Sequence, residues 1–226
     1  MKCSLENEAL ERILVWPYNR RIAILSNYEY AKQILQAFLM SKIAKCTSEN
    51  IYLIDYSGRF RSELLSNIVG REKLENIVYL EKFIDEIRGY SLHIHNPSES
   101  NVRIGSSIRN VDVEFIIITD YSPSKALKGT KGFLKVYCRK RKNKIYELKT
   151  FADKVLIAVS EGKIVEAFKI LPKYLFRALS LLKEAAAEYG NYTVKDAVII
   201  VSARMNVNKN FARKIISDLV SYGFIE

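Results

Sequence analysis

The residues best suited to chemistry in this sequence are cations gathered in one short stretch. The run RKRKNK begins at Arg139 and lies between two apolar segments, so we expect a β-hairpin turn there. Cations on a turn neutralise phosphates by releasing counterions, and the nearby Phe133, Tyr137 and Tyr146 could stack on unpaired bases. The expected nucleic-acid contacts are Lys128, Lys131, Arg139, Lys140, Arg141, Lys142 and Lys144. A solvated charged turn without a partner is the alternative.

A second group of candidate contact residues lies near residue 210. An amphipathic helix is expected over 173–188, and Thr193 and Asn208 are suitable N-caps for two more helices. This order is similar to a winged helix-turn-helix, whose last helix enters the major groove. The expected contacts are Asn208, Lys209, Asn210, Arg213 and Lys214, with Phe211, Ile215, Ile216 and Leu219 facing the core. Binding of a protein through the same helix is the alternative.

The remaining reactive residues do not form a catalytic group in the sequence. His93 and His95 have the spacing of two zinc ligands on one face of a strand, but no further ligand is placed nearby, so we expect a surface loop and no metal. Cys3, Cys46 and Cys138 are widely spaced without a CxxC pair, and we expect three free thiols. No Ser-His-Asp or Cys-His arrangement is present, so we expect no catalytic residue.

Strands alternating with helices must position these candidates. In the first half, we expect strands at 21–25, 51–55, 77–80 and 113–119, and helices at 30–44, 61–75 and 81–89. The polar segment 89–110 is expected to be a loop that contains at most one marginal strand. Four further strands, expected to be antiparallel, follow at 133–138, 144–149, 154–159 and 163–168. The prediction is an α/β domain over 1–171, with a mainly parallel sheet flanked by helices and antiparallel edge strands. A small all-α domain over 172–226 completes it.

The order of elements over 21–168 resembles the RecA-like recombinase group, especially small archaeal RadA paralogues. The resemblance rests on IYLIDYSGRFRSELL at 51–65, FIIITD at 115–120 and the late strands at 151–168. It implies an ATPase scaffold in which Asp55 ends one strand and Asp120 ends the Walker B strand facing a metal. It also implies a role in DNA recombination, repair or chromosome maintenance.

The nucleotide site implied by this resemblance is degenerate. A P-loop needs G-x-x-x-x-G-K-[ST], and in the matching window 26–33 only Lys32 remains. Glu29 places a carboxylate where phosphate would bind, Gln33 lacks the metal-binding hydroxyl, and Ser57 stands where the group has its water-activating Glu. The degenerate site comprises Lys32, Gln33, Asp55, Ser57 and Asp120, of which Lys32 and Asp120 are the candidates for residual nucleotide binding. We therefore expect a pseudo-ATPase without a cofactor.

Composition supports a polyanionic partner. The chain has 36 Lys and Arg against 25 Asp and Glu, a formal net charge of +11, and the residue usage of a heat-adapted archaeal protein. Without a long apolar run or a basic leader, we expect a cytoplasmic protein that binds double- or single-stranded DNA, possesses no membrane contact, and could form a homodimer or bind a recombinase or helicase. The alternatives are an ATP-dependent enzyme with an unusual P-loop, a transcription regulator and a protein-binding adaptor.

Overall fold

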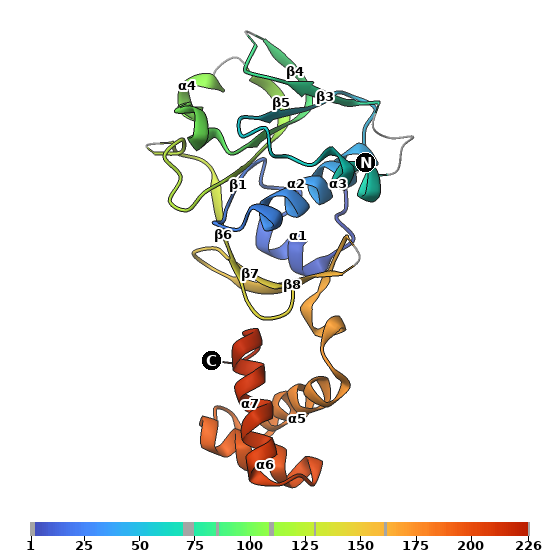
Figure 1. Ribbon diagram of the computed structural model, residues 1–226, viewed down its shortest axis with the longest axis vertical. Helices are drawn as coiled ribbons and strands as arrows, with labels where there is room; N and C mark the ends of the chain where they lie inside the picture. Colours follow the sequence, from blue (N-terminus) through green and yellow to red (C-terminus); the bar gives the residue numbers. More distant parts are fainter. Residues whose placement is uncertain are drawn as a thin grey trace.

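A single mixed sheet organises most of the chain (Figure 1). The computed structural model describes residues 3–69, 75–84, 86–108, 111–128, 130–160 and 162–225. The strands are β1 (Arg21–Leu25), β2 (Ile51–Asp55), β3 (Ile77–Leu80), β4 (Ile87–His95), β5 (Val111–Asp120), β6 (Leu134–Lys140), β7 (Ile145–Lys149), β8 (Lys154–Ser160) and β9 (Lys163–Glu166). The helices are α1 (Glu8–Leu14), α2 (Glu29–Ala44), α3 (Ser62–Val69), α4 (Ile104–Ser107), α5 (Lys173–Tyr189), α6 (Val194–Met205) and α7 (Lys209–Tyr222), with 3₁₀ turns η2 (Pro97–Ser100) and η3 (Ala167–Ile170).

The sheet order is β3-β2-β4-β5-β1-β6-β7-β8-β9, and its first six strands are parallel. The α/β prediction with antiparallel edge strands is confirmed for β7, β8 and β9. It is wrong for 133–138, because β6 runs parallel to β1. A parallel neighbour requires a crossover, and residues 121–133 supply it by returning over the sheet to the start of β6.

Two apolar cores cover the two faces of the sheet. Helices α1, α2 and α3 pack on the face that carries Ile22, Ile24 and Ile117. The opposite face, with Ala23 and Leu25, is covered by α4 and by the crossover segment. The alternation along β1 therefore matches a strand buried on both sides, as parallel sheets require. The expected helix at 61–75 is present as α3. Residues 70–74 of that expected helix lie outside the described part of the chain.

Strand β4 is the largest error of the sequence-based prediction. It pairs with β2 and β5 near the middle of the parallel sheet, where we expected the end of a helix over 81–89 followed by a polar loop. Ser91, His93 and His95 share one face of this strand and are fully buried. These polar side chains conceal a buried strand because hydropathy patterns identify only apolar ones.

The cysteine prediction is wrong for two of the three residues. Cys3 and Cys46 form a disulfide, with their Cα atoms 5.5 Å apart, whereas Cys138 is a buried free thiol. The N-terminal segment lies beside the end of α2, so residues 43 positions apart in the sequence become neighbours. Trp16 strengthens this placement, because its indole Nε1 donates a hydrogen bond of 2.7 Å to the Cys3 carbonyl.

Reduction of this disulfide should lower the free energy of unfolding by about 2 kcal/mol, at the low end of the usual range for a disulfide. The loop that it closes is long, but Leu5, Leu10 and Trp16 remain buried and hold the segment without it. Urea unfolding with and without dithiothreitol measures the difference. Cys46→Ala should give the same loss and remove the sensitivity to reductant, whereas an unchanged midpoint in both tests would contradict the pairing.

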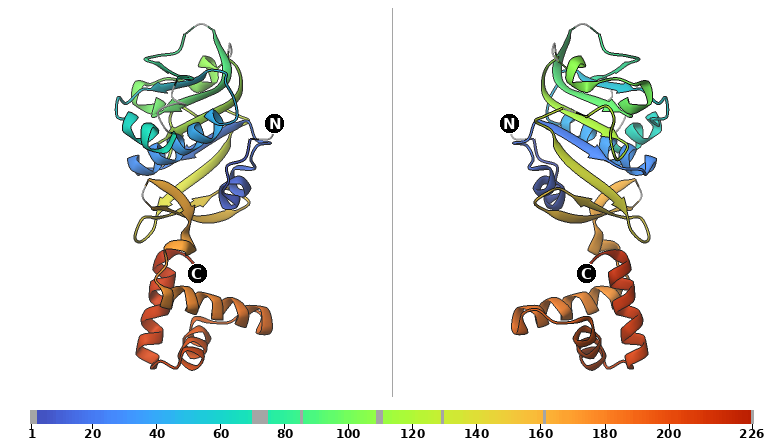
Figure 2. Two further views of the ribbon diagram at one scale, coloured as in Figure 1. Left: turned by 90° about the vertical axis from the view of Figure 1, so that its right-hand side faces the viewer. Right: turned by 90° about the vertical axis from the view of Figure 1, so that its left-hand side faces the viewer.

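The last three helices form a separate layer beyond the antiparallel strands (Figure 2). The expected caps are confirmed: Thr193 forms a capping box with Asp196, and the Asn208 side chain accepts from the Phe211 amide at 2.8 Å. Only residues 206–208 separate α6 from α7, a turn length typical of helix-turn-helix units. Within the described ranges, no helix has the length and apolar character needed to cross a membrane.

Candidate functional site

The connection after β1 is too short to surround a phosphate. Only residues 26–28 separate β1 from α2, and the rest of the window 26–33 is helical. The amides of Ala31 and Lys32 donate to the Tyr28 carbonyl at 3.1 and 3.2 Å, so they serve the first helical turn. A P-loop instead directs such amides at the ligand. Tyr28 and Tyr30 do not fill the place where a P-loop would hold its phosphate, since each keeps 44% of its surface exposed.

Lys32, the one remaining P-loop residue, is completely buried and fully engaged. Its ammonium group lies 2.9 Å from the Glu29 carboxylate, donates to the Asn96 side-chain oxygen, and sits 3.5 Å from the centre of the Tyr121 ring. Burial lowers the pKa of Lys32, and the Glu29 carboxylate opposes this shift. A lysine has three N–H donors, so none is left for a ligand phosphate.

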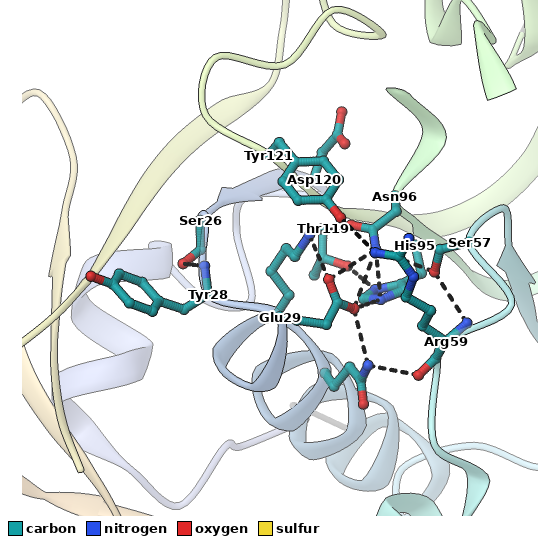
Figure 3. Close-up of polar contacts among 12 residues, drawn as sticks. Ser26, Tyr28, Glu29, Ser57, Arg59, His95, Asn96, Thr119, Asp120 and Tyr121 are labelled. Atoms are coloured by element: carbon teal, nitrogen blue, oxygen red, sulfur yellow. Dashed lines mark hydrogen bonds and ion pairs between the residues drawn. The ribbon is translucent and has the colours of Figure 1, made fainter. Parts of the chain in front are cut away.

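Glu29 provides the anion that this lysine binds (Figure 3). Besides Lys32, its carboxylate accepts from His95 Nε2 at 2.6 Å, from Gln33 Nε2 at 3.0 Å and from Asn96 Nδ2 at 3.1 Å. Burial alone would raise the pKa of Glu29, but these hydrogen bonds outweigh it and hold the pKa well below its usual range. An internal carboxylate therefore takes up the donors that a nucleotide phosphate would need.

A second layer of hydrogen bonds orients His95. Its Nδ1 lies 2.6 Å from Thr119 Oγ1 and 2.9 Å from Gln36 Oε1. Because Nε2 faces a carboxylate, the proton is assigned to Nε2, and Nδ1 then accepts from the Thr119 hydroxyl, since Gln36 Oε1 has no hydrogen to donate. The ring of Phe60 meets the imidazole edge-on, with 5.4 Å between ring centres. This histidine is thus built into the interior of the domain, and the expectation of a surface loop is wrong for it and for His93.

Asp55 and Ser57 organise the turn after β2. The Asp55 carboxylate accepts from the Ser57 amide and hydroxyl at 2.9 and 2.7 Å, and from the Phe60 amide at 2.7 Å. Ser57 Oγ in turn accepts from Asn96 at 3.2 Å, which joins this turn to the Glu29 network. Gln33 adds a second link by donating to the Arg59 carbonyl at 2.7 Å. Four predicted residues of the degenerate site, including Lys32, therefore meet in one closed network.

Asp120 is close to this network but turned away from it (Figure 3). Its Oδ2 atom accepts from the hydroxyls of Ser98 and Ser124 at 2.6 and 2.5 Å, and its side chain is fully buried. Its Oδ1 atom has no partner within the described residues. Over the same ranges, no three His, Cys, Asp or Glu side chains converge in the manner of a metal site. The carboxylate fixes the turn at η2 and the start of the crossover segment.

His93 is buried beneath α2 without a hydrogen bond to either ring nitrogen among the described residues. It is flanked in the sheet by Leu53 and Ile117. Burial lowers the pKa of His93 to about 3. The folded protein therefore keeps this imidazole neutral over most of the acidic range.

Acid should destabilise the fold through His93. The unfolded chain takes up this proton below about pH 6.5 and the folded chain only near pH 3, so stability falls as the pH falls between these values. From pH 7 to 5 the wild type should lose about 2 kcal/mol more than His93→Leu. Urea titrations of each protein at both pH values measure this, and equal losses would contradict the buried neutral histidine. Since each protein is compared with itself, any other effect of the substitution cancels.

The basic hairpin between β6 and β7 is docked on α7. Lys142 Nζ lies 2.6 Å from Asp218 and 5.4 Å from the centre of the Tyr222 ring, and Asn143 donates to Tyr222 Oη at 2.6 Å. The hydrogen bond to Asp218 raises the pKa of Lys142. Arg141 pairs with Glu147 on the neighbouring strand. Two of the predicted contact cations are thus neutralised within the chain.

Three cations of the hairpin stay available for contact with a ligand. Arg139, Lys140 and Lys144 are exposed and make no ion pair within the described residues. Lys131 lies before the start of β6, and the strand rises about 3.3 Å per residue, so roughly 20 Å of strand separates it from the turn. Lys128 belongs to the crossover segment over the sheet. The seven predicted cations therefore do not form one cluster.

The exposed half of α7 carries most of the residues predicted for it. Lys209, Asn210, Arg213 and Lys214 all lie on the surface, and Arg213 donates to the Asn210 side chain at 3.1 Å. Asn208 is occupied as the helix cap. Phe211 does not face the core as expected: it remains 40% exposed and lies beside Tyr174, with 6.1 Å between ring centres. Ile215, Ile216 and Leu219 are buried as predicted.

Sequence reasoning missed the two features that shape these regions. Glu29 was expected to obstruct a phosphate, but its partner His95 ends a strand that the hydropathy pattern hid, and its partner Asn96 directly follows that strand. The docking of the hairpin on α7 joins residues more than 70 positions apart, and no local pattern predicts such pairs. No protein-family model matches this chain, and no curated protein matches it in sequence.

Proposed function

We propose that this protein is a nucleic-acid-binding accessory protein without ATPase activity, and that it binds duplex DNA through α7 and the β6–β7 hairpin. The single observation that carries the proposal is the docking of the hairpin on the helix through Lys142–Asp218 and Asn143–Tyr222. This contact holds the hairpin against the carboxyl-terminal half of α7, so the two separately predicted basic elements are neighbours and can act on one ligand.

The spacing of the two basic groups suits a duplex. An α-helix rises about 1.5 Å per residue, so Lys214 and Tyr222 are separated by roughly 12 Å along α7. Contacts at this distance fall within one turn of B-DNA, which is about 34 Å long. The helix would enter the groove while Lys140 and Lys144 neutralise the neighbouring backbone. The net charge of +11 favours the same class of ligand.

The closed network around Glu29 supports the second part of the proposal. Nucleotide binding at this point would require a phosphate to displace the carboxylate from Lys32, His95 and Asn96. Lys32 is the one cation of the predicted degenerate site, so no second cation of that site could neutralise the phosphate. The α/β domain therefore serves as a rigid platform, and a role beside a recombinase or helicase in DNA recombination or repair remains part of the proposal.

Titration of a fluorescent duplex by anisotropy tests the proposal. Binding should weaken steeply between 50 and 200 mM salt, with a slope of about −0.9 for each phosphate neutralised in a plot of log K against log salt. Five or six contacts correspond to a slope near −5. Absent binding, or binding that salt does not change, would contradict it.

A sequence-specific regulator is the second candidate function. The exposed pair Asn210 and Arg213 favours it, because asparagine can read adenine and arginine can read guanine. Selection from a random-sequence duplex library distinguishes the two functions. An enriched motif that loses affinity with Arg213→Ala would identify a regulator, and an unenriched pool would identify an accessory protein that contacts only the backbone.

A further inference from the structure

A cavity of about 420 Å³ lies on the face of β1 opposite α2. The crossover segment forms one wall with Ser122, Lys125 and Lys128, and β6 forms the other with Lys135 and Tyr137. Leu25, the last residue of β1, lies at its floor. None of the residues in the closed network around Glu29 lines this cavity, so the cavity is a separate candidate site.

The position of the cavity in the topology is typical of a ligand site. After β1 the chain continues through α2 to β2 on one side, whereas after β5 it crosses to β6 on the other side of β1. Crevices at the carboxyl ends of parallel strands, beside connections that leave over opposite faces of the sheet, are the usual binding sites of α/β sheets. This cavity lies at such a point, next to the last residue of β1. The volume also lies within the range of about 300–1,000 Å³ found for small-molecule pockets.

Three ammonium groups give the cavity its chemical character. Lys125, Lys128 and Lys135 form no ion pair within the described residues, and none of the lining residues is acidic. Lys125 and Lys128 also line an adjoining cavity of about 500 Å³, to which Arg103 contributes a fourth cation. Four cations kept close together without a carboxylate repel one another, so a bound anion would stabilise the arrangement.

Tyr137 adds a flat surface beside the charge. Alternate residues of a strand are about 6.6 Å apart on the same face, so the Tyr137 ring stands next to Lys135. The ring is 46% exposed, and Leu25, Leu127 and Pro123 supply apolar contacts around it. An anionic group on the lysines would therefore place an attached planar group against the tyrosine.

We propose that this cavity binds a small phosphorylated ligand with a planar ring, of which a mononucleotide is the simplest example. The lysines hold the phosphate and Tyr137 stacks on the ring. The site is independent of the duplex-binding surface on α7, because it lies on the sheet under the crossover segment.

Isothermal titration of the full-length protein with AMP tests this site, with adenosine and inorganic phosphate as probes of each half. AMP should bind with a Kd near or below about 1 mM, and each half alone at least about tenfold more weakly. Lys128→Ala with Lys135→Ala should weaken AMP by about tenfold or more, and Tyr137→Ala should weaken AMP but not phosphate. Lys131→Ala removes a lysine of the same segment outside the cavity and should change nothing.

Several results would overturn the proposal. Among them are no heat of binding at millimolar AMP, an equal loss in Lys131→Ala, and AMP binding that Lys32→Met abolishes. Binding of a short oligothymidylate without binding of AMP or dTMP would also overturn it, because the ligand would then be a strand. Thermal unfolding of each variant identifies any that is misfolded. If the variant with Lys128→Ala is misfolded, Lys128→Gln replaces that substitution, because glutamine removes the charge and shortens the side chain by only one atom. A loss of duplex binding by α7 variants leaves this test unaffected.

Discussion

Replacing Glu29 with Gln should lower the free energy of unfolding by about 3 kcal/mol, because it leaves the buried Lys32 ammonium without its counterion. Breaking a buried ion pair costs roughly 3–5 kcal/mol, and the lower value is expected because 31% of the Glu29 side chain remains exposed. The amide would also lose the charge that His95 Nε2 contacts at 2.6 Å. Urea unfolding of both proteins measures the change.

A matched control and a second variant separate charge from packing. Glu63→Gln alters an exposed carboxylate in the first turn of α3 and should change stability by less than about 0.5 kcal/mol. Lys32→Met combined with Glu29→Gln removes both charges and should be more stable than Glu29→Gln alone, since an apolar side chain tolerates burial. If the double variant were as unstable as the single one, the internal ion pair would not be what closes this site.

Removal of three cations from α7 should lower the affinity for duplex DNA by about 100-fold to 1,000-fold. Lys209→Ala, Arg213→Ala and Lys214→Ala take away exposed charges that no ion pair neutralises within the described residues. Each lost contact costs about 1 kcal/mol or slightly more, and the plot of log K against log salt should become shallower by about two to three. Anisotropy of a labelled duplex gives both quantities.

The matched control removes the same charge elsewhere. Lys45, Arg61 and Lys82 are exposed on the α/β domain, and their combined replacement by Ala also lowers the net charge by three. It should reduce the affinity by no more than about threefold, because only long-range attraction is lost. Equal losses in the two triple variants would show that net charge, rather than the surface of α7, determines binding.

The sequence predicted those elements of the fold that leave a local pattern in it, and it missed those that do not. Apolar strands such as β1 and β2 and the capped helices α6 and α7 were predicted within a residue or two, because hydropathy and N-caps are local signals. β4 was missed because its buried face is polar. The direction of β6 was missed because a crossover without a helix leaves no periodic pattern in the sequence.

The candidate sites divide in the same way. The resemblance singled out Lys32 and Ser57, and residue type and spacing singled out the cations of α7, which the structure places on the surface. It did not reveal that Lys142 is neutralised by Asp218, or that three lysines surround a cavity beside Tyr137. Such relations depend on which distant segments pack together. The number of charged residues can therefore be read from a sequence, but the fold decides which of them are free to contact a ligand.

The most direct test of the account is the affinity for duplex DNA measured with and without ATP and Mg²⁺. A closed site in which Glu29 occupies Lys32 predicts the same salt-dependent dissociation constant in both conditions, within about twofold. A constant that improves tenfold or more with ATP, and returns to its original value in Lys32→Met, would contradict it. That result would mean that a nucleotide opens the Glu29 network and controls DNA binding.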